Sequence, residues 1–165
     1  MIIKAIQDDI FNTDLKHIAF SINKEGFNDE GFAGKVASKY WNDLFDCGNN
    51  KIGTILAKTI KGKTFYAIVS YSLIDGWKEK QAEFIKDCFD KIDSKGEEIA
   101  TIAIGDEFIE TMAGSNIKEI ICGMHDSKQK IVLYSQYKLE QIIKCYNEYK
   151  EKTDELKILT LIKDN

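Results

Sequence analysis

The stretch from Gln7 to Tyr40 decides the fold: it reads Gln-Asp-Asp-Ile-Phe (7–11), His-Ile-Ala-Phe-Ser-Ile-Asn (17–23) and Gly-Phe-Ala-Gly-Lys-Val-Ala (31–37). The first piece follows a short apolar strand, and the second is a largely apolar strand that ends at Asn23. The third opens a helix, because apolar residues recur at helical spacing up to residue 45. A strand, a polar turn, a second strand and a glycine-rich helix start together indicate an α/β unit.

The rest of the chain continues this alternation of strands and helices. We expect strands at 2–6, 17–22, 52–59, 64–70, 99–104, 130–134 and 156–162, and helices at 31–45, 75–92, 115–122 and 139–149. Lys61-Gly62-Lys63 joins two β-rich runs, which predicts a hairpin. The sequence therefore predicts a three-layer α/β/α fold with a mixed, mostly parallel central sheet, in one domain over residues 1–165.

Composition and charge limit which partners and which cellular location we expect for the protein. The chain has 165 residues and a formal net charge of -4, so we expect no broad nucleic-acid surface, while a local basic patch stays open. No apolar run approaches the ~20 residues of a membrane span, and the first residues do not resemble a signal peptide. We therefore expect a soluble cytoplasmic protein without a membrane partner, and a monomer.

The cysteines and histidines give no support to a metal or cofactor. Cys47, Cys88, Cys122 and Cys145 are widely spread without a C-x-x-C pair, so we expect buried thiols and neither a zinc site nor disulfides. His17 stands near the start of a strand, where a structural role is expected. His125 follows Gly123, where we expect a helix end and a cap or surface role.

In open α/β sheets, ligands bind beyond the carboxyl ends of the strands. This rule nominates four loops, which follow the expected strand ends Ile6, Ile22, Ser70 and Ile104. They span residues 7–9, 23–34, 71–76 and 105–114.

The order of these parts resembles the macro domain, a family that binds ADP-ribose. By this resemblance Asp9 accepts a hydrogen bond from the adenine amino group, and the Ile10 backbone meets the ring edge. Asn23 then lies near the distal ribose. Backbone N–H groups of the Gly31-Phe-Ala-Gly34 helix start approach the ribose and diphosphate. Read without the resemblance, Asp9 caps or turns the chain and Asn23 closes a strand.

Within that family the chain is most similar to the branch of the terminal ADP-ribose glycohydrolase and the ADP-ribose-1″-phosphate phosphatases. The similarity covers residues 1 to about 135, and an expected helix and strand in 136–165 extend it. Two family positions differ: Ala33 stands where some hydrolases have an acid, and Ser70-Tyr71-Ser72 lacks the lysine that forms a sugar adduct. The second loop is acidic where the family is glycine-rich.

The resemblance implies a full set of site residues. Glu110 is the candidate acid or base, and Asn23 positions the ribose or a water. The ligand-binding residues implied are Asp9, Ile10, Asn23, Gly31, Phe32, Ala33, Gly34, Ser70, Gly105, Asp106, Glu107, Phe108 and Ile109.

Three functions remain open from the sequence. The chain is a hydrolase that removes a 1″-phosphate or cleaves an ADP-ribosyl ester, with ADP-ribosylated macromolecules as partners. Alternatively it is a binding module without turnover, or a macro-like fold recruited for protein contacts through the acidic loop. No metal or cofactor is implied.

Overall fold

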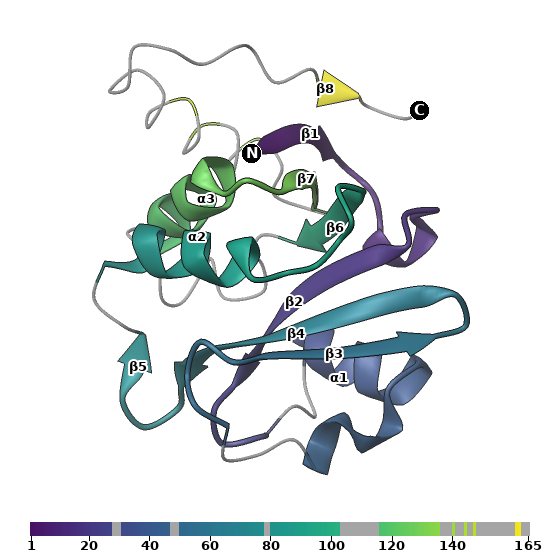
Figure 1. The fold of residues 1–165 in the computed structure, drawn as a ribbon, viewed down its shortest axis with the longest axis vertical. Coiled ribbons are helices and arrows are strands. Elements are labelled where there is room, and N and C mark those ends of the chain that lie inside the picture. The colour runs from purple at the N-terminus through teal and green to yellow at the C-terminus, as the bar shows by residue number, and fades with distance from the viewer. Residues whose placement is uncertain are drawn as a thin grey trace.

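A computed structural model describes residues 1–27, 31–46, 50–77, 80–102 and 116–135, together with 140, 144, 147 and 161–162. The described strands form one sheet in the order β3-β4-β2-β6-β7-β1-β8, with β5 paired to β4 (Figure 1). They are β1 (Ile2–Ile6), β2 (His17–Asn23), β3 (Ile55–Ile60), β4 (Lys63–Ser72), β5 (Gly76–Trp77), β6 (Glu98–Ile102), β7 (Lys130–Tyr134) and β8 (Leu161–Ile162).

The sheet is mixed but mostly parallel, as the sequence predicts. Strand β2 pairs in parallel with β4 and β6, and β7 pairs in parallel with β6 and β1. Only β3 and β5 run antiparallel to their neighbour β4 among the described strands. The β3–β4 hairpin turns at Lys61-Gly62, where both residues have positive φ angles of 51° and 79°. A parallel sheet needs cover on both faces, and helices supply it.

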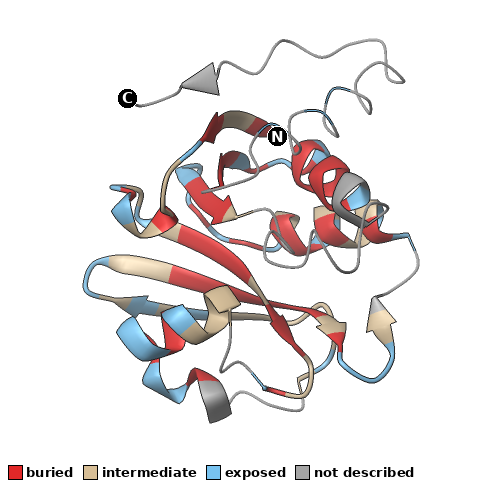
Figure 2. Cartoon of the chain, turned by 180° about the vertical axis from the view of Figure 1, so that it is seen from behind, coloured by how far each residue is buried: buried red, intermediate tan, exposed pale blue. Residues whose placement is uncertain are grey.

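Alternate residues of each strand enter two separate cores. On one face, Ala19, Tyr66 and Ile131 pack against α2 (Gln81–Asp90) and α3 (Asn116–Asp126). On the other face, Phe20 and Phe65 pack against α1 (Gly31–Lys39). This period-2 division makes three layers, and the central strands are the most buried part of the chain (Figure 2).

Two expected helices begin or end elsewhere. Helix α1 stops at Lys39, because the N–H groups of Tyr40 and Trp41 both donate to the Val36 carbonyl; a separate 3-10 turn, η2 (Asn42–Asp46), follows. The helix expected from residue 75 starts only at Gln81. Residues 76–77 instead form β5 against the end of β4, an edge pairing that overrides the helical pattern of the sequence.

Helices α2 and α3 lie unusually close together. A Cβ added at Gly123 would lie 2.4 Å from the Ala82 carbonyl oxygen, so only glycine fits at this contact. The Glu119 carboxylate accepts a hydrogen bond of 3.0 Å from the backbone N–H of Gln81, at the start of α2. His125 is buried in the last turn of α3, rather than beyond the helix end or on the surface. Helix α3 continues past Gly123 because that glycine serves this contact.

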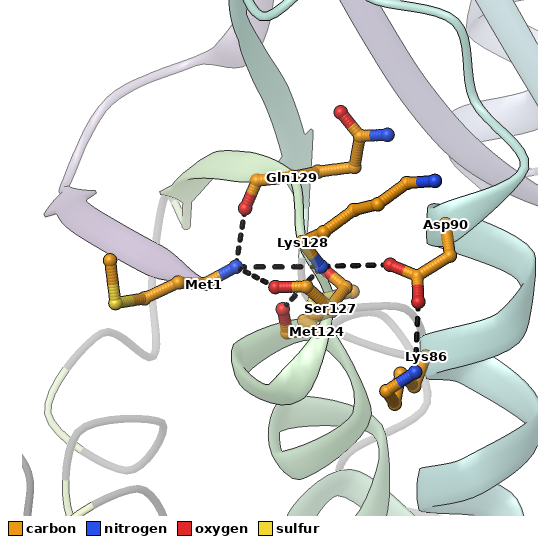
Figure 3. A network of polar contacts seen from close by, with 7 residues as sticks. All are labelled: Met1, Lys86, Asp90, Met124, Ser127, Lys128 and Gln129. Atoms are coloured by element: carbon orange, nitrogen blue, oxygen red, sulfur yellow. Dashed lines mark hydrogen bonds and ion pairs between the residues drawn. The ribbon is translucent and has the colours of Figure 1, made fainter.

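The start of β1 is fixed by the turn between α3 and β7 (Figure 3). The Met1 ammonium donates to the carbonyl oxygens of Ser127, at 2.6 Å, and Gln129. The backbone N–H of Lys128 donates to Asp90 on α2, whose other oxygen pairs with Lys86 at 2.8 Å. Burial disfavours the ionised Asp90 carboxylate, but the Lys86 and Lys128 hydrogen bonds outweigh it and hold the pKa of Asp90 below its usual value.

The remaining expectations concern thiols, membranes and the C-terminal region. Cys88 and Cys122 are buried thiols; Cys47 and Cys145 lie outside the described residues. In the described part of the chain, no helix has the length and apolar character that crossing a bilayer requires. Most of the helix expected at 139–149 lies outside the described residues, and β8 pairs with β1 within the strand expected at 156–162.

Candidate functional site

The carboxyl ends of the parallel strands meet at one edge of the sheet. Strands β1, β2 and β4 end there at Ile6, Asn23 and Ser72. The loops that follow β1 and β2 therefore lie beside the start of α1. The described candidate residues reach this edge from the turn after β1, the end of β2 and the start of α1.

Asp9 caps the 3-10 turn η1 (Ile10–Asn12) that follows β1. Its Oδ1 atom accepts a hydrogen bond of 3.0 Å from the backbone N–H of Phe11. Asp8 adds a second cap, because its Oδ1 accepts from the Asp9 N–H at 2.7 Å. The capping role read from the sequence is thus present. A carboxylate has about four acceptor positions, so Asp9 retains capacity for a ligand amino group.

Aromatic rings join η1 to the start of α1. The Phe11 ring stacks on Phe32 at 5.2 Å between ring centroids, and Phe32 also meets Phe20 edge-on at 5.7 Å. Ile10 is buried in the same core, with 3% of its surface exposed. These contacts fix the Asp9-Ile10 backbone beside the Gly31–Gly34 segment, which is the juxtaposition that the resemblance implies.

The first turn of α1 offers backbone N–H groups at an accessible position. Gly31 has a φ angle of 62°, in the left-handed region that favours glycine. Phe32, Ala33 and Gly34 are all half-buried, and the small residues Ala33 and Gly34 would allow a ligand to approach the backbone closely. Unpaired N–H groups and the helix dipole favour an anion there.

Asn23 is buried and its amide is already hydrogen-bonded within the chain. Its Nδ2 donates to the Phe27 carbonyl at 2.6 Å, and its Oδ1 accepts from the Phe27 N–H at 3.0 Å. Burial raises the pKa of Tyr71, and a hydrogen bond with the Asn23 side chain offsets part of that rise. Asn23 therefore shapes the loop after β2; its predicted contact with a ribose stays a prediction and requires sharing or exchanging these bonds.

Ser70 lies below the edge rather than on it. The β2–β4 register shifts between Ile22 and Asn23, and Ser70 lies in the irregularity between Val69 and Tyr71. Its side chain is fully buried and hydrogen-bonds the Ser21 hydroxyl. A ligand contact predicted for Ser70 would thus involve its backbone or need the hydroxyl pair to open.

Glu25 forms a clamp that holds the two loops beside the site together, and no sequence pattern predicted it. The Glu25 carboxylate accepts from the Ser72 hydroxyl at 2.5 Å and from the Leu73 N–H at 2.9 Å. These two hydrogen bonds lower the pKa of Glu25. Because the partners are 47 and 48 residues away, no local spacing rule could have found the pair.

The second loop falls outside the described residues. This applies to Glu110, Gly105, Asp106, Glu107, Phe108 and Ile109, whose predicted roles therefore remain predictions. The described ranges contain no cluster of three or more His, Cys, Asp or Glu side chains that could hold a metal. His17 starts β2 at the far edge of the sheet, where its Nδ1 lies 3.0 Å from the Tyr66 hydroxyl.

The chain matches no protein-family model and no curated protein. Solved structures do match. An Oceanobacillus iheyensis macrodomain mutant with ADPR has a TM-score of 0.63 at 12% identity, covering 90% of this chain and 91% of that one. A Trypanosoma brucei macrodomain in complex with ADP-ribose has a TM-score of 0.60 at 12% identity, covering 88% and 67%.

A third similar structure is much longer than this chain. It is "Alphavirus P23pro-zbd", with a TM-score of 0.65 at 15% identity; the match covers 95% of this chain but only 25% of that one. At sequence identities this low, the structural similarity establishes the fold and nothing further. The chain has the macrodomain fold, as the sequence predicted.

Proposed function

We propose that this macrodomain fold binds ADP-ribose or a close derivative at the carboxyl edge of its sheet. One observation carries the proposal: the Phe11–Phe32 stack holds the Asp9-Ile10 turn against the open first turn of α1. An acceptor for an adenine amino group and a set of N–H groups for phosphate thus lie side by side. The O. iheyensis and T. brucei macrodomains, similar in fold, were solved with this ligand.

The two subsites divide the ligand by chemistry. Asp9 is acceptor-only when ionised, which selects an amino-bearing base such as adenine. The N-terminus of α1 provides donors without a side-chain cation, which suits a diphosphate. The Glu25 clamp fixes the rim by joining the loops after β2 and β4.

Hydrolysis needs a group that activates water or attacks the anomeric carbon. Among the described carboxylates at this edge, Asp8 and Asp9 act as caps and Glu25 forms its clamp. Removal of a 1″-phosphate or cleavage of an ADP-ribosyl ester therefore rests on Glu110 as the proposed acid or base. Binding without turnover, and recruitment of the fold for protein contacts, remain the alternatives.

Calorimetric titration with ADP-ribose tests the binding proposal. We expect saturable binding by the wild-type protein and at least a tenfold loss in Asp9→Ala, or about 1.4 kcal/mol. Asp8→Ala is the matched control, because it also removes a cap of the same turn but no proposed ligand contact. Equal losses in both variants would assign the effect to the turn, and no heat with the wild type would refute the proposal.

Turnover is tested separately on Glu110. If Glu110→Gln retains ADP-ribose affinity but loses release of phosphate from ADP-ribose-1″-phosphate or cleavage of an ADP-ribosyl ester, the chain is a hydrolase. If wild-type protein binds but turns over neither substrate, the non-catalytic alternative holds.

A further inference from the structure

Lysines and aromatic rings alternate on the α1 face, around the end of the helix. The Lys39 ammonium lies 4.5 Å from the centroid of the Phe11 ring, at the end of α1. The Lys61 ammonium, in the β3–β4 turn, lies 5.9 Å from the Tyr40 ring. Phe11 and Tyr40 stack on each other at 5.8 Å, so the rings link the two cations into one surface.

Further lysines join this surface from the helix and from the start of β2. Lys35 lies one turn before Lys39 on the same side of α1, and both are exposed. Lys16 is exposed beside the hairpin, since its carbonyl accepts the Thr64 N–H at 2.7 Å. We call these four exposed lysines (Lys16, Lys35, Lys39 and Lys61) the basic patch.

The described acidic residues on this face include Asp14 and Asp43. Asp43 pairs with Lys58, a fifth lysine on this face, and Asp14 lies in the loop before Lys16. Lys63 is directed inward, where it donates to the Thr13 and Leu15 carbonyls. In a chain whose formal net charge is -4, this local excess of positive charge makes the surface electrostatically distinct.

The rings also order the cations. An ammonium over an aromatic face is attracted by the ring, which restricts a side chain that would otherwise be mobile. Ordered lysines lose less entropy when they bind a charged partner. Phe11 and Tyr40 are half-buried, so they also offer apolar area between the charges.

We propose that the basic patch binds single-stranded nucleic acid. A phosphodiester backbone supplies regularly spaced anions that complement the lysines. A flexible single strand can follow lysines arranged around a helix end and a hairpin turn, and its unstacked bases can contact the half-buried rings. A duplex keeps its bases stacked and its backbone straight, so it fits this short, curved surface less well. The basic patch shares the Phe11 ring with the proposed ADP-ribose site, but none of its lysines is a proposed ADP-ribose contact.

Fluorescence anisotropy with a labelled 12-nucleotide oligo(dU) or oligo(U) tests the proposal. We expect binding that weakens with salt, with a log–log slope of about -2 to -3 if three or four lysines contact phosphates. Lys39→Gln/Lys61→Gln should weaken binding at least tenfold at low salt and reduce the slope by about 1.4. ADP-ribose binding by this variant is expected to remain unchanged.

A structurally matched control removes the same charge elsewhere. The control variant is Lys91→Gln/Lys95→Gln. Lys91 lies at the end of α2, as Lys39 lies at the end of α1. Lys95 has a φ angle of 56° in a turn, as Lys61 has one of 51°. This control should retain wild-type affinity. Equal weakening in both double variants would show a net-charge effect and overturn the proposal.

Two competitors test the identity of the partner. We expect a 12-base-pair duplex to bind at least fivefold more weakly than the single strand, and heparin to compete only at a large excess of charge. Duplex or heparin binding as tight as the single strand would show a general polyanion surface and overturn the assignment. Absence of wild-type binding at 50 mM salt would also overturn it.

Discussion

The two faces of the sheet are packed in different ways. On the α2/α3 face, aliphatic residues such as Ile85 and Ile120 are fully or almost fully buried, and the helices touch at Gly123. On the α1 face, a deeply buried layer around Phe20 gives way to half-buried rings, including Phe11 and Phe32. Both faces cover the same strands, but among the described residues ten partly buried hydrophobic side chains pack against the second core and two against the first.

This difference separates stability from recognition. Adding or removing an atom in a closely packed interior lowers the free energy of unfolding, because the neighbouring side chains cannot rearrange freely. Half-buried rings tolerate change better and can contact a ligand. We therefore expect substitutions on the α2/α3 face to alter the free energy of unfolding, and those on the α1 face to alter binding.

The largest expected effect is that of Phe89→Ala. Phe89 is fully buried on the α2/α3 face, so its truncation should lower the free energy of unfolding by about 4 kcal/mol, measured by urea denaturation. Phe27→Ala removes the same atoms at a position that is 70% exposed, and it should change the free energy of unfolding by less than about 0.5 kcal/mol. Similar values for the two would contradict the account of this core.

Gly123→Ala tests the close contact between α2 and α3. The added methyl group would overlap the Ala82 carbonyl, and the resulting shift should cost about 2–3 kcal/mol even though alanine favours a helix. Gly96→Ala is the control, since its Cβ meets nothing within 4 Å and only the φ of 79° opposes it, at about 1 kcal/mol. If Gly123→Ala is as stable as the wild type, the helices are not held this closely.

Phe32→Ala should affect ligand binding more than it affects stability. Because Phe32 is half-buried, we expect a loss of only about 1–2 kcal/mol in the free energy of unfolding. ADP-ribose affinity should fall about tenfold, as the Phe11 ring loses the partner that holds the Asp9-Ile10 turn. Phe32→Leu should restore part of the affinity. A variant that loses stability but binds normally would remove Phe32 from the account of the site.

The smallest expected effect is on how the stability of the protein depends on pH. The pKa of Glu25 lies below its ordinary value of 4.5 because the Ser72 hydroxyl and the Leu73 N–H stabilise the ionised carboxylate. Its contribution to stability is therefore present above about pH 4.5 and is lost as the pH falls through the lower folded-state pKa. Glu25→Gln should weaken the dependence of the melting temperature on pH in this acidic range. Glu83→Gln, at an exposed position of α2, should leave that dependence unchanged. Unchanged acid dependence in Glu25→Gln would contradict the clamp.

Local sequence patterns predicted much of the fold. The strands at 2–6 and 130–134 were predicted with their observed bounds, because short, mainly apolar runs bounded by polar residues mark a buried strand. The start of α2 was predicted too early, since pairing between β5 and the end of β4 is a non-local contact. Periodicity cannot register such a contact.

The site was predicted less completely, and for a similar reason. Residue type and position placed Asp9, Asn23 and Gly31–Gly34 at the carboxyl edge, because strand ends share an edge in a parallel sheet. The hydrogen bonds that engage Asn23 and Glu25 depend on the conformation of the loops after β2 and β4. The sequence alone gave no geometry for these loops.

The central claim is that the α1 face, and not the α2/α3 face, carries the ligand site. Titration of ¹⁵N-labelled protein with ADP-ribose, followed through backbone amide shifts, tests it directly. We predict large saturable shifts at Ile10, Phe11, Ala33 and Gly34, with Ile85 and Ile121 nearly unchanged. Shifts centred on α2 and α3, or their absence at the start of α1, would contradict the account.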